Sequence, residues 1–333
     1  MIAKRRTNRS LAAKPKALEQ GWPANFGRAG APCVLILGAG ASAPYGLPIG
    51  IALRDYILKL PPDSYSRYLD ELGIQQPQFR EFLTQFSRSG FLSIDAFLEE
   101  RSRWMKIGKF AIAFTLINHE HTRKLFPPYA PKDHWFNALW LKLKKKTWNE
   151  VKQTTLRIVT FNYDRCLEYY LARVIANNFG VSFTEVFRWL SQVFVIHVHG
   201  TLGDYTLLNY YWKDPKKGEQ VIDGIKNAID AIVVVSEANP KTRQFARART
   251  AISRANSVAF IGFGFGESNM SRLGLPPDHQ FWPTDIWLSC TLKGLSPSAR
   301  SRIKRQYFWK RTLHSSHKSA SISQLIEDFV QVY

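Results

Sequence analysis

The sequence predicts an α/β fold, in which a doubly wound, Rossmann-like parallel sheet of about six strands carries a helical insertion. Six short apolar runs, typical of buried parallel strands, follow one another from residue 34 onward. Most of them are followed by a segment in which apolar residues recur at helical spacing. Strands that alternate with helices in this way form a parallel sheet with helices on both faces.

The chain begins with a polar, basic segment at residues 1–30, which we interpret as a tail or a surface-draped arm. Its arginines would suit a transit peptide, but no long amphipathic stretch supports that interpretation. We expect residues 31–333 to form one domain. Its predicted strands are residues 34–37, 156–161, 193–198, 231–235, 258–262 and 286–290.

The predicted helical insertion covers about residues 51–150, between the first and second strands. Phe79, Phe82, Leu83 and Phe86 show the spacing of a buried helix face. Further helices are predicted at residues 96–98, with Ser93 or Asp95 as the cap, and at 109–117, 135–143, 164–176 and 243–255. A crossover of a hundred residues is far longer than a βαβ unit needs, so we interpret this region as an added helical layer and a plausible lid.

Composition excludes several classes of protein. The chain of 333 residues is 45% hydrophobic and 14% aromatic, which is typical of a globular protein rather than a disordered one. No apolar run approaches the roughly 18 residues of a membrane-spanning helix, and no apolar stretch follows the basic N-terminus as in a secretory signal. The three cysteines, Cys33, Cys166 and Cys290, stand far apart and suit a reducing, cytoplasmic location.

The charge balance is strongly basic. Lysine and arginine number 46 against 26 acidic residues, which gives a net charge of +20. The excess is spread over the N-terminal tail, residues 142–146 and residues 300–311. It fits a solvated basic surface, and it also fits a nucleic-acid partner or attraction of nucleotide phosphates.

Four polar motifs follow predicted strands. They are GAGASAPYGLP at residues 38–48, TFNYD at 160–164, HVHGTLG at 197–203 and GFGFGESN at 262–269. Because ligands of open α/β sheets bind outside the carboxyl ends of the strands, we expect these motifs to meet at one site. The first motif is suited to a phosphate loop, since its glycines allow close backbone approach and a following helix N-terminus supplies N–H groups.

Each motif also has a plainer structural interpretation. His197 and His199 alternate onto one face of a strand and could form a metal pair, although no third ligand at metal spacing is evident. His199 could be structural, Asn162 a turn residue, and Asp164 the cap of the next helix. The glycines at 262, 264 and 266 could serve only a tight turn.

Taken together, the four motifs resemble those of the sirtuins. GAGASAPYGLP looks like the sirtuin phosphate loop, FNYD like the ribose segment, HVHG like the catalytic His-Gly, and SVAFIGFGFGESN like the adenosine-side strand and loop. The resemblance extends to the sirtuin-like NAD hydrolases of prokaryotic antiviral defence, in which FNYDRxLE and a GFGF segment ending in Asn recur. It covers residues 33–290 in order.

The resemblance implies an NAD-binding domain and a role for each matched residue. It places Asn162 where water or ribose is oriented and His199 as the general base. The positions expected to bind NAD are Gly38, Ala39, Gly40, Ala41 and Ser42 at the pyrophosphate, Asp164 at the ribose, and Gly262, Gly264 and Asn269 beside the adenosine. Gly40→Val is accordingly expected to abolish NAD binding in a folded protein.

The implied activity is cleavage of NAD to nicotinamide and ADP-ribose by an NAD-depleting defence effector, acting as a homo-oligomer or with a partner defence protein. Two alternatives stay open. One is an NAD-dependent protein deacylase or ADP-ribosyltransferase. The other is a non-catalytic subunit that binds NAD, ADP-ribose or nucleic acid.

The chain departs from the deacylating sirtuins in two places. It lacks their four zinc-binding cysteines, and Ile49-Gly50-Ile51 stands where they carry Asp-Phe-Arg. These replacements suggest a pocket that admits water rather than an acylated lysine peptide.

Zinc content tests this distinction. Because three scattered cysteines cannot form a four-cysteine site, the purified protein should contain no stoichiometric zinc. Elemental analysis of the protein, purified without chelators, measures this directly. One tightly bound zinc per chain would contradict the prediction and favour the deacylase.

Overall fold

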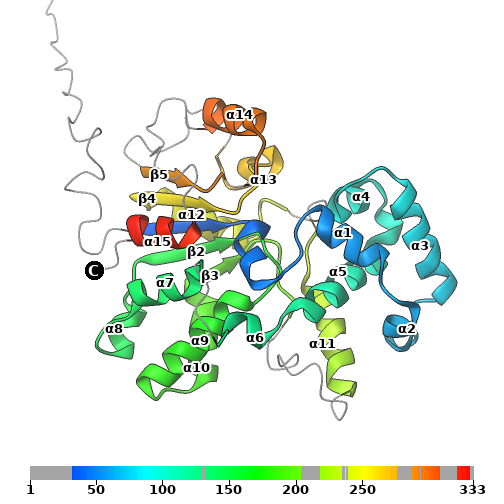
Figure 1. Cartoon of the computed structure of the whole chain (residues 1–333), viewed down its shortest axis with the longest axis horizontal. Coiled ribbons are helices and arrows are strands. Elements are labelled where there is room, and N and C mark those ends of the chain that lie inside the picture. Colours follow the sequence, from blue (N-terminus) through cyan, green and yellow to red (C-terminus); the bar gives the residue numbers. More distant parts are fainter. Residues whose placement is uncertain are drawn as a thin grey trace, which may run out of the picture.

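A computed structural model of the chain describes residues 32–128, 133–203, 218–234, 237, 239–275, 287–292, 294–307 and 321–330 (Figure 1). The predicted N-terminal tail lies outside the described residues, as does part of the basic run at 300–311. None of the helices in the described ranges is both long enough and apolar enough to cross a membrane.

The described residues form one parallel sheet of five strands, in the order β3-β2-β1-β4-β5. Its strands are β1 (Cys33–Leu37), β2 (Leu156–Thr160), β3 (Val195–His197), β4 (Ser257–Ile261) and β5 (Trp287–Cys290). All four pairings are parallel. The predicted α/β class with a parallel sheet is confirmed, whereas the predicted number of about six strands is wrong.

The missing strand is the apolar run at residues 231–235. Helix α11 (Gly218–Ala231) continues through its first residue, and residues 232–234 then run without sheet pairing. Ile232 and Val234 are nevertheless fully buried. The N–H of Val233 donates to the carbonyl of His199 at 2.9 Å. The apolar run therefore predicted burial correctly, but it did not predict the type of secondary structure. Apolar character alone does not distinguish a buried strand from a helix end.

Helices cover both faces of the sheet, as expected of a doubly wound fold. Along β1, Cys33, Leu35 and Leu37 pack in one core and Val34 and Ile36 in another. The first core includes α7 (Trp135–Leu143), α9 (Cys166–Phe179) and α15 (Ile322–Phe329), and the second includes α12 (Arg243–Ser253), α13 (Glu267–Arg272) and α14 (Pro297–Tyr307).

The connection from β1 to β2 is helical, and α1 to α5 form a group beside the sheet (Figure 1). Besides α7, the helices of this connection are α1 (Ile51–Leu58), α2 (Pro62–Glu71), α3 (Gln76–Arg88), α4 (Ile94–Glu100), α5 (Met105–His119), α6 (Thr122–Leu125) and α8 (Trp148–Lys152). Phe79, Phe82 and Phe86 are fully buried, as their spacing predicts. Ser93 stands at the N-cap of α4, but its side chain makes no capping hydrogen bond.

Strand β3 is shorter than the strand predicted at residues 193–198. Helix α10 (Phe183–Trp189) continues into one turn of π-helix at Leu190–Phe194, so regular pairing begins only at Val195. β3 ends at His197, and Val198 and His199 lie in a turn. This turn determines where each of the two histidines points.

Candidate functional site

A cavity of about 230 Å³ lies at the carboxyl ends of β1, β2, β3 and β4. Eight of the eleven residues proposed from the sequence line it: Gly38, Ala39, Ser42, Asn162, Asp164, His199, Gly264 and Asn269. The motifs therefore meet at one site, at the edge of the sheet where ligands of open α/β folds bind. Gly40, Ala41 and Gly262 are not among the lining residues.

The loop after β1 has a different conformation from the one expected. It forms two short 3₁₀ turns, Ala39–Ala41 and Ala43–Tyr45, and the first α-helix begins only at Ile51. The expectation that a helix N-terminus follows the loop directly is therefore wrong. Several loop N–H groups bond within the loop, but the N–H of Ala39 takes part in none of the described backbone hydrogen bonds. Any contact of this loop with an anion would use such backbone groups.

Glycines hold the loop against the end of β4. The N–H groups of Gly38 and Gly40 donate to the carbonyls of Ile261 and Gly262, each at 3.0 Å. A Cβ atom on Gly40 would lie 2.8 Å from the Cα of Gly262. Gly262 has a φ of +56°, and a Cβ atom there would lie 2.2 Å from the nitrogen of Ala41. Gly40 thus meets protein backbone, which contradicts the expectation that Gly40→Val leaves the fold intact.

The helical insertion also fixes this loop. The indole N–H of Trp135 donates to the carbonyl of Ala41, and the N–H of Phe136 donates to the hydroxyl of Tyr45, both at 2.8 Å. The rings of Tyr45 and Phe136 stack at 3.7 Å between centroids. Because all of these groups are buried, the loop is rigidly positioned from both the sheet and α7.

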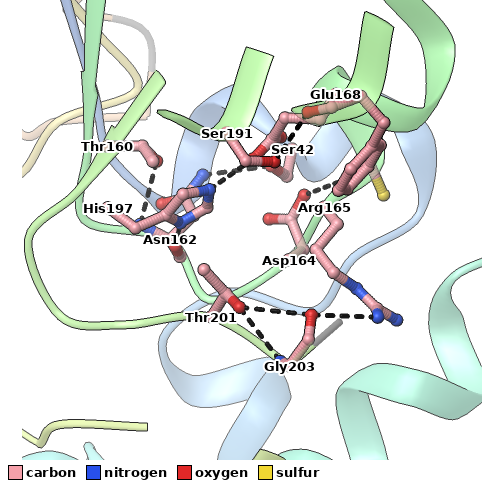
Figure 2. A network of polar contacts seen from close by, with 12 residues as sticks. Ser42, Thr160, Asn162, Asp164, Arg165, Glu168, Ser191, His197, Thr201 and Gly203 are labelled. Atoms are coloured by element: carbon pink, nitrogen blue, oxygen red, sulfur yellow. Dashed lines mark hydrogen bonds and ion pairs between the residues drawn. The ribbon is translucent and has the colours of Figure 1, made fainter. Parts of the chain in front are cut away.

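Asn162 is the second residue after β2 and is the centre of a polar network (Figure 2). Its N–H donates to Thr160 Oγ1 and its side-chain Nδ2 donates to Ser42 Oγ, both at 3.0 Å. The side-chain Oδ1 is buried and has no hydrogen-bond partner among the described residues. A buried acceptor without a partner is costly unless a ligand or water satisfies it, which makes Asn162 a candidate to hold a water molecule or a ligand group.

His199 is 3% exposed and lies in the turn after β3. Its Nδ1 lies 3.0 Å from the carbonyl oxygen of Val233, which can only accept, so Nδ1 carries the proton and Nε2 is the basic nitrogen. Nε2 is buried and forms no hydrogen bond within the geometric limits, although the Asn269 side chain is near. Burial lowers the pKa of His199, with Arg272 adding to this, while the Val233 carbonyl and Asn269 oppose it. The ring is therefore neutral at pH 7 and able to accept a proton.

His197 does not share this environment. Its Nδ1 donates to the carbonyl of Asn162 at 2.9 Å, and its Nε2 makes a short contact with Glu168 Oε1. Burial alone would lower the pKa of His197, but Glu168 and the Asn162 carbonyl outweigh it and the pKa is raised. Both ring nitrogens of His197 are engaged by protein groups, so the structure gives no support to a metal pair of His197 and His199. His197 instead positions the backbone of Asn162 (Figure 2).

Asp164 lies one residue before Arg165, the N-cap of α9, so it is not itself the cap considered for it. Its Oδ1 accepts a hydrogen bond from the N–H of Cys166 at the start of α9, at 3.2 Å, and the residue also lines the cavity. Burial raises its pKa to about 6, and Glu120 and Glu168 add to the shift, whereas the Ser42 hydroxyl and the Cys166 N–H oppose it. A carboxyl with such a pKa can exchange a proton near neutral pH.

Asp95 and Tyr163 complete the polar lining and were not proposed as site residues. The hydroxyl of Tyr163 donates to Asp95 Oδ1 at 3.2 Å, and burial raises the pKa of Asp95. Asp95 belongs to α4, in the insertion, so no local spacing relates it to the four motifs. The sequence indicated only that it could cap a helix.

A buried ion pair ties the same insertion to the site. Arg165 Nη2 lies 2.6 Å from Glu120 Oε2, and the backbone N–H of Arg165 donates to Glu120 Oε1 at 2.9 Å. Their side chains are 2% and 3% exposed. Arg165 also donates to the carbonyl of Gly203 at 3.3 Å (Figure 2). One guanidinium therefore joins the end of α5, the start of α9 and the loop after His199.

The remaining two proposed residues, Gly264 and Asn269, lie past the end of β4. A Cβ atom on Gly264 would have no atom within 4 Å, and Asn269 Oδ1 is buried without a hydrogen bond. Both features leave room for a ligand group on this side of the cavity. Neither the protein-family models nor the curated protein sequences include a match to this chain. The function is therefore argued from the geometry of the site and from its motifs.

The two kinds of glycine in the site can be separated experimentally. Gly40→Ala forces an atom against the Gly262 backbone and should destabilise the fold by about 1–3 kcal/mol. Gly264→Ala places a methyl group in open space beside the cavity and should leave the fold unchanged. Thermal and urea unfolding of both variants measures the difference. Unaltered stability of Gly40→Ala would show that the loop does not pack as described.

The raised pKa of Asp164 predicts a pH-dependent stability. Its folded pKa of about 6 lies above its ordinary value of 3.8, so the ionised carboxylate destabilises the folded state. This cost is absent below about pH 4 and complete above about pH 7, where a shift of this size corresponds to about 2–3 kcal/mol. Asp164→Asn should therefore gain stability relative to wild type as the pH rises from 4.5 to 8, measured by urea unfolding. The exposed Asp70→Asn on α2 is the control, and an equal pH trend in both variants would contradict the assignment.

Proposed function

We propose that this protein is an NAD hydrolase that cleaves the bond between nicotinamide and ribose and releases nicotinamide and ADP-ribose. One observation carries the proposal. A single cavity is lined by Gly38, Ala39 and Ser42 of the loop after β1, by Asn162, whose Oδ1 has no hydrogen-bond partner among the described residues, and by His199, whose Nε2 is unprotonated. This set matches, residue by residue, the positions that the resemblance to sirtuins assigns to pyrophosphate, water and general base.

The lining offers different surroundings to the two halves of a dinucleotide. Leu47, Ile49 and Leu53 contribute apolar side chains, whereas Gly264 and Asn269 follow the end of β4. We assign the nicotinamide to the apolar side chains and the adenosine ribose to Gly264 and Asn269. The enclosed volume of about 230 Å³ is below the roughly 300 Å³ at which small-molecule sites begin, so part of the dinucleotide would extend beyond it.

Cleavage of NAD requires stabilisation of an oxocarbenium-like transition state at C1′ of the ribose. The bonding electrons of the C1′–N bond pass to the nicotinamide nitrogen, which becomes neutral as the bond breaks. The carboxyl groups of Asp95 and Asp164, when ionised, supply negative potential in a buried site, which favours the developing positive charge.

Water then attacks C1′ and loses a proton. Asn162 Oδ1 is placed to accept a hydrogen bond from this water without adding charge, and the neutral Nε2 of His199 takes its proton. The Glu168–His197 pair keeps the Asn162 backbone in position during this step. The products are nicotinamide, ADP-ribose and one proton.

The biological role is also part of the proposal. An NAD-depleting effector of antiviral defence, acting in the cytoplasm as a homo-oligomer or with a partner defence protein, is what the resemblance of the four motifs implies.

Two substitutions test the mechanism. His199→Ala and Asn162→Ala should each lower kcat for nicotinamide release by about 10²–10⁴-fold, because a positioned base contributes that much. The Kd for NAD, measured by calorimetry, should stay within a few-fold, since neither residue belongs to the phosphate loop. His119→Ala is the matched control, because that ring contacts Tyr56 and does not line the cavity.

Three other outcomes of these measurements would each contradict one part of the proposal. Near-normal nicotinamide release by His199→Ala would remove it as the base. Release by the wild-type protein only in the presence of an acylated or acceptor protein would favour the transferase alternative. NAD binding without turnover by the wild-type protein would leave a non-catalytic binding subunit.

A further inference from the structure

A second hollow of about 500 Å³ lies away from the NAD cavity, between α12 and the sheet at the edge strand β3. Four arginines line it, together with apolar residues that form its floor: Arg157, Arg243, Arg247, Arg254, Val193 and Ile196. We call it the arginine groove. It shares no lining residue with the NAD cavity.

The arginines are brought together by regular secondary structure. Arg243, Arg247 and Arg254 recur along α12 and its C-cap at i, i+4 and i+11, which places them on one face of the helix. At 1.5 Å per residue this stripe is about 16 Å long. Arg157 comes from β2, where Leu156 and Ile158 pack in the opposite core and Val159 packs in the core of α12. Its side chain therefore emerges on the α12 side.

None of the described residues that line the groove is acidic, and none of its four arginines forms an ion pair with a described residue. Their hydrogen bonds go to neutral acceptors instead. Arg157 Nη1 donates to the carbonyls of Thr154 and Leu156, each at 2.7 Å, and Arg247 Nη2 donates to the carbonyl of Gln192 at 2.5 Å. These bonds orient the guanidinium groups without neutralising them.

The positive charges also disfavour one another. Partial burial lowers the pKa of Arg157, and Arg247 adds to this effect. Partial burial likewise lowers the pKa of Arg247, with Arg243 contributing. Arginine stays protonated despite such shifts, so the charges remain and an anion in the groove would relieve their repulsion.

The shape and composition of the groove identify the anion. A stripe of about 16 Å is too long for one phosphate group but fits several consecutive phosphates of a strand, which in a duplex follow at about 3.4 Å along the axis. None of the described residues that line the groove is aromatic, so contacts with the sugar-phosphate backbone rather than base stacking would supply the affinity. Arginine is suited to phosphate through its planar set of donors.

We propose that the arginine groove binds the sugar-phosphate backbone of a nucleic-acid strand without sequence preference. The net charge of +20 would attract the same ligand at long range, and the groove gives that charge a defined place of contact. This inference is independent of the activity proposed for the NAD cavity.

The test uses the full chain and a fluorescein-labelled 20-nucleotide oligo-dT, with binding followed by fluorescence anisotropy at several salt concentrations. The test variant is Arg243→Gln/Arg254→Gln, since both side chains are exposed and should not be needed for folding. The control is Arg80→Gln/Arg88→Gln on α3, which removes the same charge from another exposed helix face. Thermal unfolding checks that all three proteins are folded.

We expect wild-type affinity to fall steeply with salt and the groove variant to bind at least about 10-fold more weakly at low salt. Because each phosphate contact on a single strand contributes about 0.7 to the slope of log K against log salt, the variant should lose between one and two units of slope. The control should stay within about two-fold of wild type.

Three results would overturn the proposal. They are no oligo-dT binding by the wild-type protein, an equal loss in the control variant, and equally tight binding of poly-glutamate of the same charge. The last would identify the groove as a docking face for an acidic polypeptide.

Discussion

The close contact between the backbones of Gly40 and Gly262 fixes the geometry of the whole site. β1 and β4 are neighbours in the sheet, and the segments that follow them are joined by backbone hydrogen bonds. Only residues without a Cβ atom allow the two segments to touch and to bond through the Gly262 carbonyl. The loop held in this way presents Ser42 to Asn162, and Asn162 in turn accepts from His197 through its carbonyl.

The insertion between β1 and β2 is part of the site and is more than an added cover. It supplies Asp95 to the cavity wall and bonds the loop through Trp135. Its buried Glu120 pairs with Arg165, which would otherwise be an uncompensated charge in the core. Removal of one partner from such a pair typically costs several kcal/mol, because the other charge remains buried. The helical layer and the sheet therefore have to assemble together for the site to form.

The sequence predicted the class of fold and most of the site because both depend on local patterns. Apolar runs indicate buried segments, and glycine or polar residues after a strand indicate its carboxyl end. The same patterns gave wrong predictions where two kinds of local structure have the same sequence pattern. In the run at 231–235, α11 ends at Ala231, and Ile232 and Val234 are buried without strand pairing. The start of the run at 193–198 is a turn of π-helix. A glycine that approaches a ligand looks like one that approaches backbone, as at Gly40.

Distance along the chain explains the rest of what was missed. Tyr163 and Asp95 are 68 residues apart, and Arg165 and Glu120 are 45 residues apart. No periodicity links such pairs, since their contact arises only when the insertion folds back on α9.

Strand β3 is short and pairs through only three residues at one border of the sheet. A border this short offers an incoming strand few main-chain donors and acceptors, so it is a poor template for intermolecular sheet growth. Copies of this chain that associate through this side would have to do so by side-chain packing.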